Sequence, residues 1–242
     1  MTPELASLIA AAVVWVFVHI GIAGTVLRDR FVRVLGERGF RGAFSLVSVA
    51  NIVWLGLAYA AAGPVRVLWQ APGWLAVLCI LLLAPASVLL VGALTVPNPT
   101  SVAGARALMS ETPAIGILRV TRYPMLWSFA LWAAAHLIVI GTLGGAIFTG
   151  AFLVVAVAGM FSLDAKYARR APAQWAAFAR ATSILPFAAI SQGRNRFAFT
   201  EIGWWRIAVG LLLWLVLIAL HPPVYGVNPW RYLGAEQQIT GS

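Results

Sequence analysis

Residues 74–94 read WLAVLCILLLAPASVLLVGAL, a run without one charged side chain. A helix of about 20 such residues crosses a hydrocarbon core of about 30 Å. Similar runs lie at 5–27, 42–62, 125–141, 143–163 and 204–221. Of the 242 residues, 62% are hydrophobic and 10% charged, whereas soluble domains average about half and about a quarter. The sequence therefore predicts an all-α, polytopic membrane protein with six transmembrane helices, organised as a single domain over residues 1–242.

Basic residues gather in alternate connections of this predicted bundle. Fourteen of the 17 Lys and Arg side chains lie between residues 28–41, 106–122 and 166–196, while the other connections and both ends carry only Arg66 and Arg231. Such a bias follows the positive-inside rule. We predict a multi-pass protein of the bacterial inner (cytoplasmic) membrane with both termini away from the cytoplasm. The net charge of +10 then reflects topology, so the expected partner is the lipid bilayer and not nucleic acid.

Local signals predict where several helices begin and end. Pro124 is expected to start the fourth helix, because proline suits the first helical turn. The fourth and fifth runs are nearly continuous and must be joined by a tight hairpin at 141–145. Two prolines after His221 are expected to end the last helix. Residues 165–181 are expected to form an amphipathic cytoplasmic helix that lies among the lipid headgroups.

Two histidines in the predicted spans each follow a tryptophan by four residues, as Trp15-x-x-x-His19 and Trp132-x-x-x-His136. Counted from the nearest arginine at 1.5 Å per residue, His19 lies about 14 Å and His136 about 21 Å inside the cytoplasmic edge. Both are therefore predicted near the midplane, and Asn51 reaches a similar depth at about 15 Å. Polar groups at such a depth are functional candidates, because a bilayer makes them expensive to keep.

Two roles for these histidines follow from their chemistry. In the first, they hydrogen-bond between helices, together with Asn51. In the second, the neutral imidazoles of His19 and His136 are metal ligands to the iron of haem b. Trp15 and Trp132 would then be flat walls beside the cofactor, with Asn51 as a further neighbour. Zinc is disfavoured, since no Cys, Asp or Glu is predicted at that depth to complete its ligand set.

Three stretches carry a resemblance to a known family. They are RVTRYPMLW at 119–127 followed by WAAAHL at 132–137, GERGFR at 36–41 followed by SLVS at 45–48, and TSILPFAAI at 182–190. Together they resemble the NnrU family over nearly the whole chain. That family takes its name from a denitrification gene cluster. Its relatives look like the zeta-carotene isomerases of plants and cyanobacteria, which are membrane enzymes that use haem b to isomerise a cis double bond.

This resemblance implies that His19 and His136 match the two haem ligands of the isomerases. The chain departs from the pattern at Tyr123, where the usual motif reads Arg-His-Pro. The isoprenylcysteine methyltransferases have a similar turn, and by that likeness Arg122 would help to bind a cofactor, S-adenosylmethionine.

We therefore expect a membrane haem protein with an isomerase-like or redox role, acting on a lipid-soluble small molecule or a diatomic gas. Two alternatives remain. One is a non-catalytic accessory protein of nitrite or nitric oxide respiration, and the other is an S-adenosylmethionine-dependent membrane methyltransferase.

Overall fold

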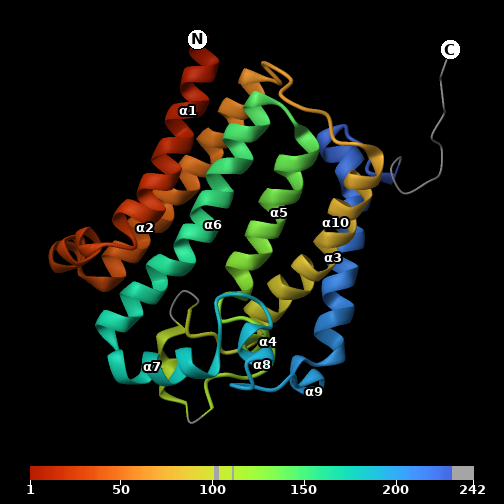
Figure 1. The fold of residues 1–242 in the computed structure, drawn as a ribbon. Coiled ribbons are helices and arrows are strands. Elements are labelled where there is room, and N and C mark those ends of the chain that lie inside the picture. The colour runs from red at the N-terminus through yellow and green to blue at the C-terminus, as the bar shows by residue number, and fades with distance from the viewer. Residues whose placement is uncertain (101–103, 111, 231–242) are drawn as a thin grey trace.

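The computed structural model describes residues 1–100, 104–110 and 112–230, and it places them in a bundle of helices (Figure 1). The first half holds α1 (Pro3–Val16), the π-helix η1 (Phe17–Ile22), α2 (Val26–Ala62), α3 (Gly73–Thr95), the 3-10 helix η2 (Gly104–Met109) and α4 (Ile117–Val120). The second half holds α5 (Pro124–Ile140), α6 (Leu143–Arg170), α7 (Pro172–Ala181), α8 (Ala188–Ser191), α9 (Phe199–Ile202) and α10 (Trp204–Tyr225).

Five of the described helices are long and apolar enough to cross a membrane: α1 with η1, α2, α3, α6 and α10. Helix α5 is also apolar but has only 17 residues. The prediction of an all-α membrane protein is therefore confirmed. The predicted count of six spans is not confirmed, because α5 is shorter than each of the other five helices.

The long helices stand side by side in an order that differs from their order in the chain. Helix α6 packs against both α1 and α5, α3 packs against α5 and α10, and α2 packs against α1. Figure 1 shows the start of α1 and the end of α10 at one end of the bundle, which we call the terminal end. The short helices α4, α7, α8 and α9 lie at the opposite end, which we call the loop end.

The predicted start of α5 and the predicted hairpin are confirmed. Helix α5 begins at Pro124 and ends at Ile140, and Gly141 follows it in a left-handed conformation with φ of 60°. Thr142 then caps α6 by accepting a hydrogen bond from the amide of Gly145 at 3.2 Å. Helix α2 bends at Gly36, where φ is 70°, a value that glycine adopts without the strain of a side chain.

The predicted end of the last helix was wrong. Helix α10 runs through Pro222 and Pro223 to Tyr225, and Gly226 follows it in the left-handed conformation. The amide of Gly226 donates to the carbonyl of Pro222 at 2.9 Å. Proline lacks a donor, but its carbonyl still accepts, so the last turn can close on it.

The amphipathic helix expected at 165–181 is divided, and its surroundings differ from the prediction. Residues 165–170 complete α6, and Pro172 begins α7. Trp175 and Phe178 share a face as expected, but they are only 4% and 0% exposed. They pack in a cluster with Tyr123, so this face of α7 covers protein and not lipid headgroups.

Candidate functional site

His19 and His136 make the same local contact in two different helices. Nδ1 of His19 lies 2.9 Å from the carbonyl oxygen of Trp15, and Nδ1 of His136 lies 2.8 Å from that of Trp132. Each contact assigns the proton to Nδ1, which donates to the carbonyl, and leaves a lone pair on Nε2. Histidines that bind metals commonly donate their second nitrogen in this way. Both imidazoles therefore have the donor chemistry of an iron ligand.

The two histidines follow their tryptophans along helices that run in opposite directions. The rings of Trp15 and Trp132 both contact Phe152 on α6, with centroids 5.1 and 5.4 Å from it. From this shared level α1 continues toward the loop end, whereas α5 continues toward the terminal end (Figure 1). Four residues correspond to about 6 Å of helix, so the backbone carries His19 and His136 from their tryptophans toward opposite ends of the bundle.

The shared depth of the two histidines in a bilayer stays a prediction. That prediction counted residues from Arg122 and assumed that the fourth helix crosses the whole membrane. In the structure α5 ends at Ile140, only four residues after His136. His136 consequently lies about 6 Å from the terminal end of its helix, not at its middle.

Each imidazole also has an aromatic neighbour from another helix. The ring of His19 meets Phe44 on α2 edge-on at 5.3 Å. The ring of His136 lies 6.3 Å from that of His221 on α10, with an angle of 24° between the planes. The sequence analysis did not connect His221 to His136. The shortness of the apolar run at 125–141 was the signal that could have placed them together.

Three buried polar atoms on α1 and α2 lack a hydrogen-bond partner among the described residues: Trp15 Nε1, Ser48 Oγ and Asn51 Oδ1. The Asn51 amide nitrogen donates to the carbonyl of Ala11 at 3.2 Å. Since Phe44 meets His19 and Asn51 meets Ala11, Ser48 is level with Trp15 in this antiparallel pair. Buried polar groups are normally satisfied by protein, water or a ligand. A polar group or water bound here would therefore complete the pairing of these atoms.

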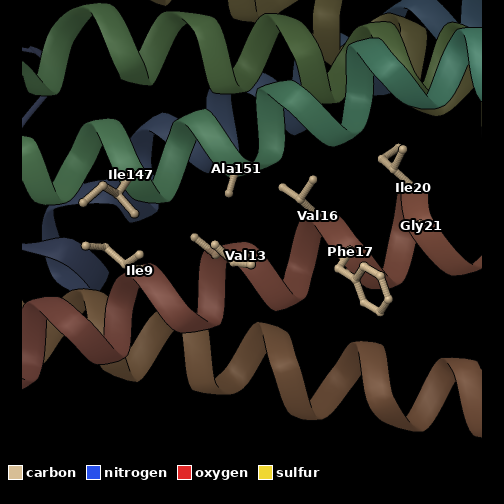
Figure 2. A pocket seen from close by; sticks show the side chains of 9 residues that line it. Ile9, Val13, Val16, Phe17, Ile20, Gly21, Ile147 and Ala151 are labelled. Carbon is tan, nitrogen blue, oxygen red and sulfur yellow. The ribbon is translucent and has the colours of Figure 1, made fainter.

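A groove of about 530 Å³ follows the other face of α1 and η1, where they pass α6 (Figure 2). Its walls include Ile9, Val13, Phe17, Ile20 and Ile147, all of which carry only hydrocarbon side chains. His19 does not belong to these walls, because its ring is turned toward α2. The groove offers a surface that hydrocarbon chains can cover.

Arg122, predicted to bind a cofactor, is engaged by protein groups. Its Nε and Nη2 donate to the two carboxylate oxygens of Asp164 at 2.9 and 2.5 Å, and its Nη1 donates to the carbonyl of Thr182 at 3.3 Å. The hydroxyl of Tyr123 donates to Asp164 at 2.5 Å. Burial and this hydrogen bond raise the pKa of Tyr123 far above its usual value, so the phenol stays protonated. Arg122, Tyr123 and Asp164 together join α5, α6 and the segment after α7.

A second ion pair connects α4 to α9 at the loop end. Arg119 donates from Nε and Nη2 to the carboxylate of Glu201 at 2.7 and 2.9 Å, and from Nη1 to Asn195 at 2.6 Å. The amide of Gly116 also donates to Glu201 at 3.0 Å. The bonds from Arg119 and from this amide hold the pKa of Glu201 below its usual range. Sequence reasoning missed both acidic partners, Asp164 and Glu201, because neither lies in the middle of an apolar run.

Comparison with known proteins identifies the family. Residues 7–229 match the family described as NnrU protein. The chain belongs to the NnrU family. A curated relative of this NnrU chain is the chloroplastic 15-cis-zeta-carotene isomerase of Arabidopsis thaliana, which is 29% identical over 207 residues. The matched region covers 80% of this chain and 52% of the isomerase, so the chain spans about half the length of that relative. No solved structure matches it.

Proposed function

We propose that this NnrU protein is a membrane haem b protein with an isomerase-like or redox role on a lipid-soluble substrate. The likeness to the zeta-carotene isomerase supports the substrate class. The observation that carries the haem is the pair of anchored imidazoles, in which both Nδ1 atoms are held by a carbonyl and both Nε2 atoms are available to iron.

In this proposal His19 and His136 would hold the iron through their imidazole nitrogens, and haem b would supply the redox or isomerisation chemistry. Trp15 and Trp132 pack on the two imidazoles, with ring centroids 4.0 and 4.8 Å away, and restrict their rotation. The unpaired Trp15 Nε1 and Asn51 Oδ1 are polar atoms of α1 and α2 with which a bound group can form hydrogen bonds.

In the described part of the chain the ring of His19 contacts Trp15 and Phe44, and the ring of His136 contacts Trp132 and His221. Joint binding of one iron therefore requires the two imidazoles to approach each other. The element that we expect to shift is η1, because a π-turn holds an extra residue relative to an α-helical turn and such turns occur often at functional sites. A change of η1 toward an α-helix would rotate His19 relative to the rest of α1.

The chain has three histidines, so a complete set of single variants is practical. We would record absorption spectra of detergent-purified protein, oxidised and then reduced with dithionite, for wild type and for His19→Ala, His136→Ala and His221→Ala. Low-spin α and β bands are expected in wild type and in His221→Ala. The bands should be lost or become high-spin in the other two variants.

A featureless wild-type spectrum after haem supplementation would overturn the haem assignment. Loss of the bands in His136→Ala and His221→Ala, with His19→Ala unaffected, would move the iron to the pair of rings that meet at the terminal end. If the wild-type spectrum is featureless, an accessory role in nitrite or nitric oxide respiration becomes the leading account. Titration with S-adenosylmethionine would then test methyl transfer. The ion pair of Arg122 with Asp164 argues against methyl transfer, because it already engages the guanidinium.

A further inference from the structure

A group of basic side chains surrounds the corner where η1 meets α2, next to the last turns of α6. Arg28 belongs to this corner, and its side chain is only 9% exposed. Its Nη2 donates to Glu37 at 2.6 Å, and its guanidinium lies over the ring of Phe40 at 5.1 Å. Its Nη1 is buried and has no hydrogen bond among the described residues, with Asp29 at 3.7 Å. One charged N–H group is therefore held in place with its hydrogen-bonding capacity unused.

Lys166 on α6 points its charge into the same neighbourhood. It interacts electrostatically with Arg28 and Arg170 and with the carboxylates of Asp29 and Glu37. Within the described part of the chain its ammonium has no hydrogen-bond acceptor, and it lies over the ring of Tyr167 at 5.2 Å. Lys166 thus supplies a second unused donor beside that of Arg28.

Positive charge exceeds negative charge in this corner. Its cations are Arg28, Arg41, Lys166 and Arg170, and its anions are Asp29 and Glu37. Glu37 accepts from both Arg28 and Arg41, and Asp29 pairs with Arg170, so both carboxylates are already engaged. The excess of two positive charges favours an additional anion beside Arg28, because the side chain of Arg28 is buried and its repulsion from neighbouring cations is weakly screened.

We propose that this corner, defined by Arg28, Lys166 and Arg170, binds a phosphate group, supplied by the headgroup of an anionic phospholipid. Phosphate oxygens would accept hydrogen bonds from Arg28 Nη1 and from the Lys166 ammonium. The surroundings favour a lipid over a free ion, since Val26, Phe31, Val34 and Leu35 on the first part of α2 are exposed apolar side chains beside the corner. Basic pockets between membrane helices next to such apolar surface are typical of headgroup sites.

The proposal can be tested by native mass spectrometry of the full chain in detergent, titrated with phosphatidylglycerol, with phosphatidylcholine and with inorganic phosphate. The wild type should retain phosphatidylglycerol in preference to phosphatidylcholine. Lys166→Gln and Arg170→Gln should each weaken this binding about fivefold, the effect of one basic residue near an anionic surface. Arg169→Gln is the matched control, because it removes the same charge from an exposed position of the same helix.

Thermal unfolding of each variant without lipid shows that it is folded before its affinity is compared. If the protein retained inorganic phosphate and not phosphatidylglycerol, and if this depended on Lys166, the site would be a site for free phosphate and the lipid assignment would be overturned. Equal weakening in Arg169→Gln and Lys166→Gln would overturn the proposal, since general surface charge would then explain the binding. Equal retention of both lipids by the wild type would overturn it too. None of these readouts involves haem, so their outcome does not depend on the proposed function.

Discussion

The contact of Asp164 with Arg122 and Tyr123 makes a sharp prediction for stability. The carboxylate accepts two hydrogen bonds from Arg122 and one from Tyr123, and it joins α6 to the start of α5. In the variant Asp164→Asn the shape is kept but the charge is lost, and one side of the amide presents a donor to the guanidinium. Arg122 would remain buried with its charge uncompensated, so the free energy of unfolding should fall.

The expected size of this effect follows from the burial of the two partners. Removal of one member of a fully buried ion pair destabilises a protein by about 3–5 kcal/mol. The side chains of Arg122 and Asp164 are 10% and 25% exposed, so solvent screens part of the lost interaction. We expect a loss of about 2–3 kcal/mol for Asp164→Asn. Tyr123→Phe removes a single hydrogen bond to a charged acceptor and should lower the free energy of unfolding by about 1.5 kcal/mol.

Equilibrium unfolding in mixed detergent micelles, followed by tryptophan fluorescence, would measure these losses. Trp127 and Trp175 report on this region, since Trp127 Nε1 donates to Ile184 at 2.8 Å and Trp175 packs beside Arg122. Asp29→Asn is the control: its ion pair is exposed, so less than about 1 kcal/mol should be lost. If Asp164→Asn lost no more stability than this control, burial would not govern the strength of the Arg122 pair, and the reasoning would be refuted.

Two further predictions concern packing and pH. Gly210→Ala should destabilise the bundle by about 1–3 kcal/mol, because an added Cβ would lie 2.6 Å from the Cα of Val88. The control Gly150→Ala should be neutral or stabilising, because nothing lies within 4 Å of its added Cβ. Thermal unfolding of both variants in detergent measures the difference. Because Arg119 holds the pKa of Glu201 below its ordinary value, the stability from this pair is present above the unfolded pKa of about 4.3 and is lost as pH falls through the lower folded value. Acid titrations of unfolding should therefore be flatter below about pH 4.3 for Glu201→Gln than for wild type, and identical slopes would contradict the ion pair's role.

The membrane-spanning architecture could be predicted because run length and apolar composition determine which segments cross a bilayer. Pro124 and Gly141 likewise act on the backbone locally, so the start and the end of α5 were predictable from the sequence. The surroundings of α7 were not: a spacing of three residues places Trp175 and Phe178 on one face, but the pattern is the same whether that face meets lipid or protein. The packing of α7 against Tyr123 decides this, and packing depends on residues distant in the chain.

In the candidate site, too, local contacts were predictable from the sequence, whereas positions that depend on distant structure were not. Any helical histidine has the carbonyl four residues earlier within reach, so the anchoring of His19 by Trp15 follows from the spacing alone. The level of each imidazole depends instead on helix direction and on where the helix stops. Because α1 and α5 run in opposite directions, the same spacing carries His19 toward the loop end and His136 toward the terminal end. A repeated motif in two antiparallel helices therefore predicts similar chemistry in both places, but it does not predict that the two places meet.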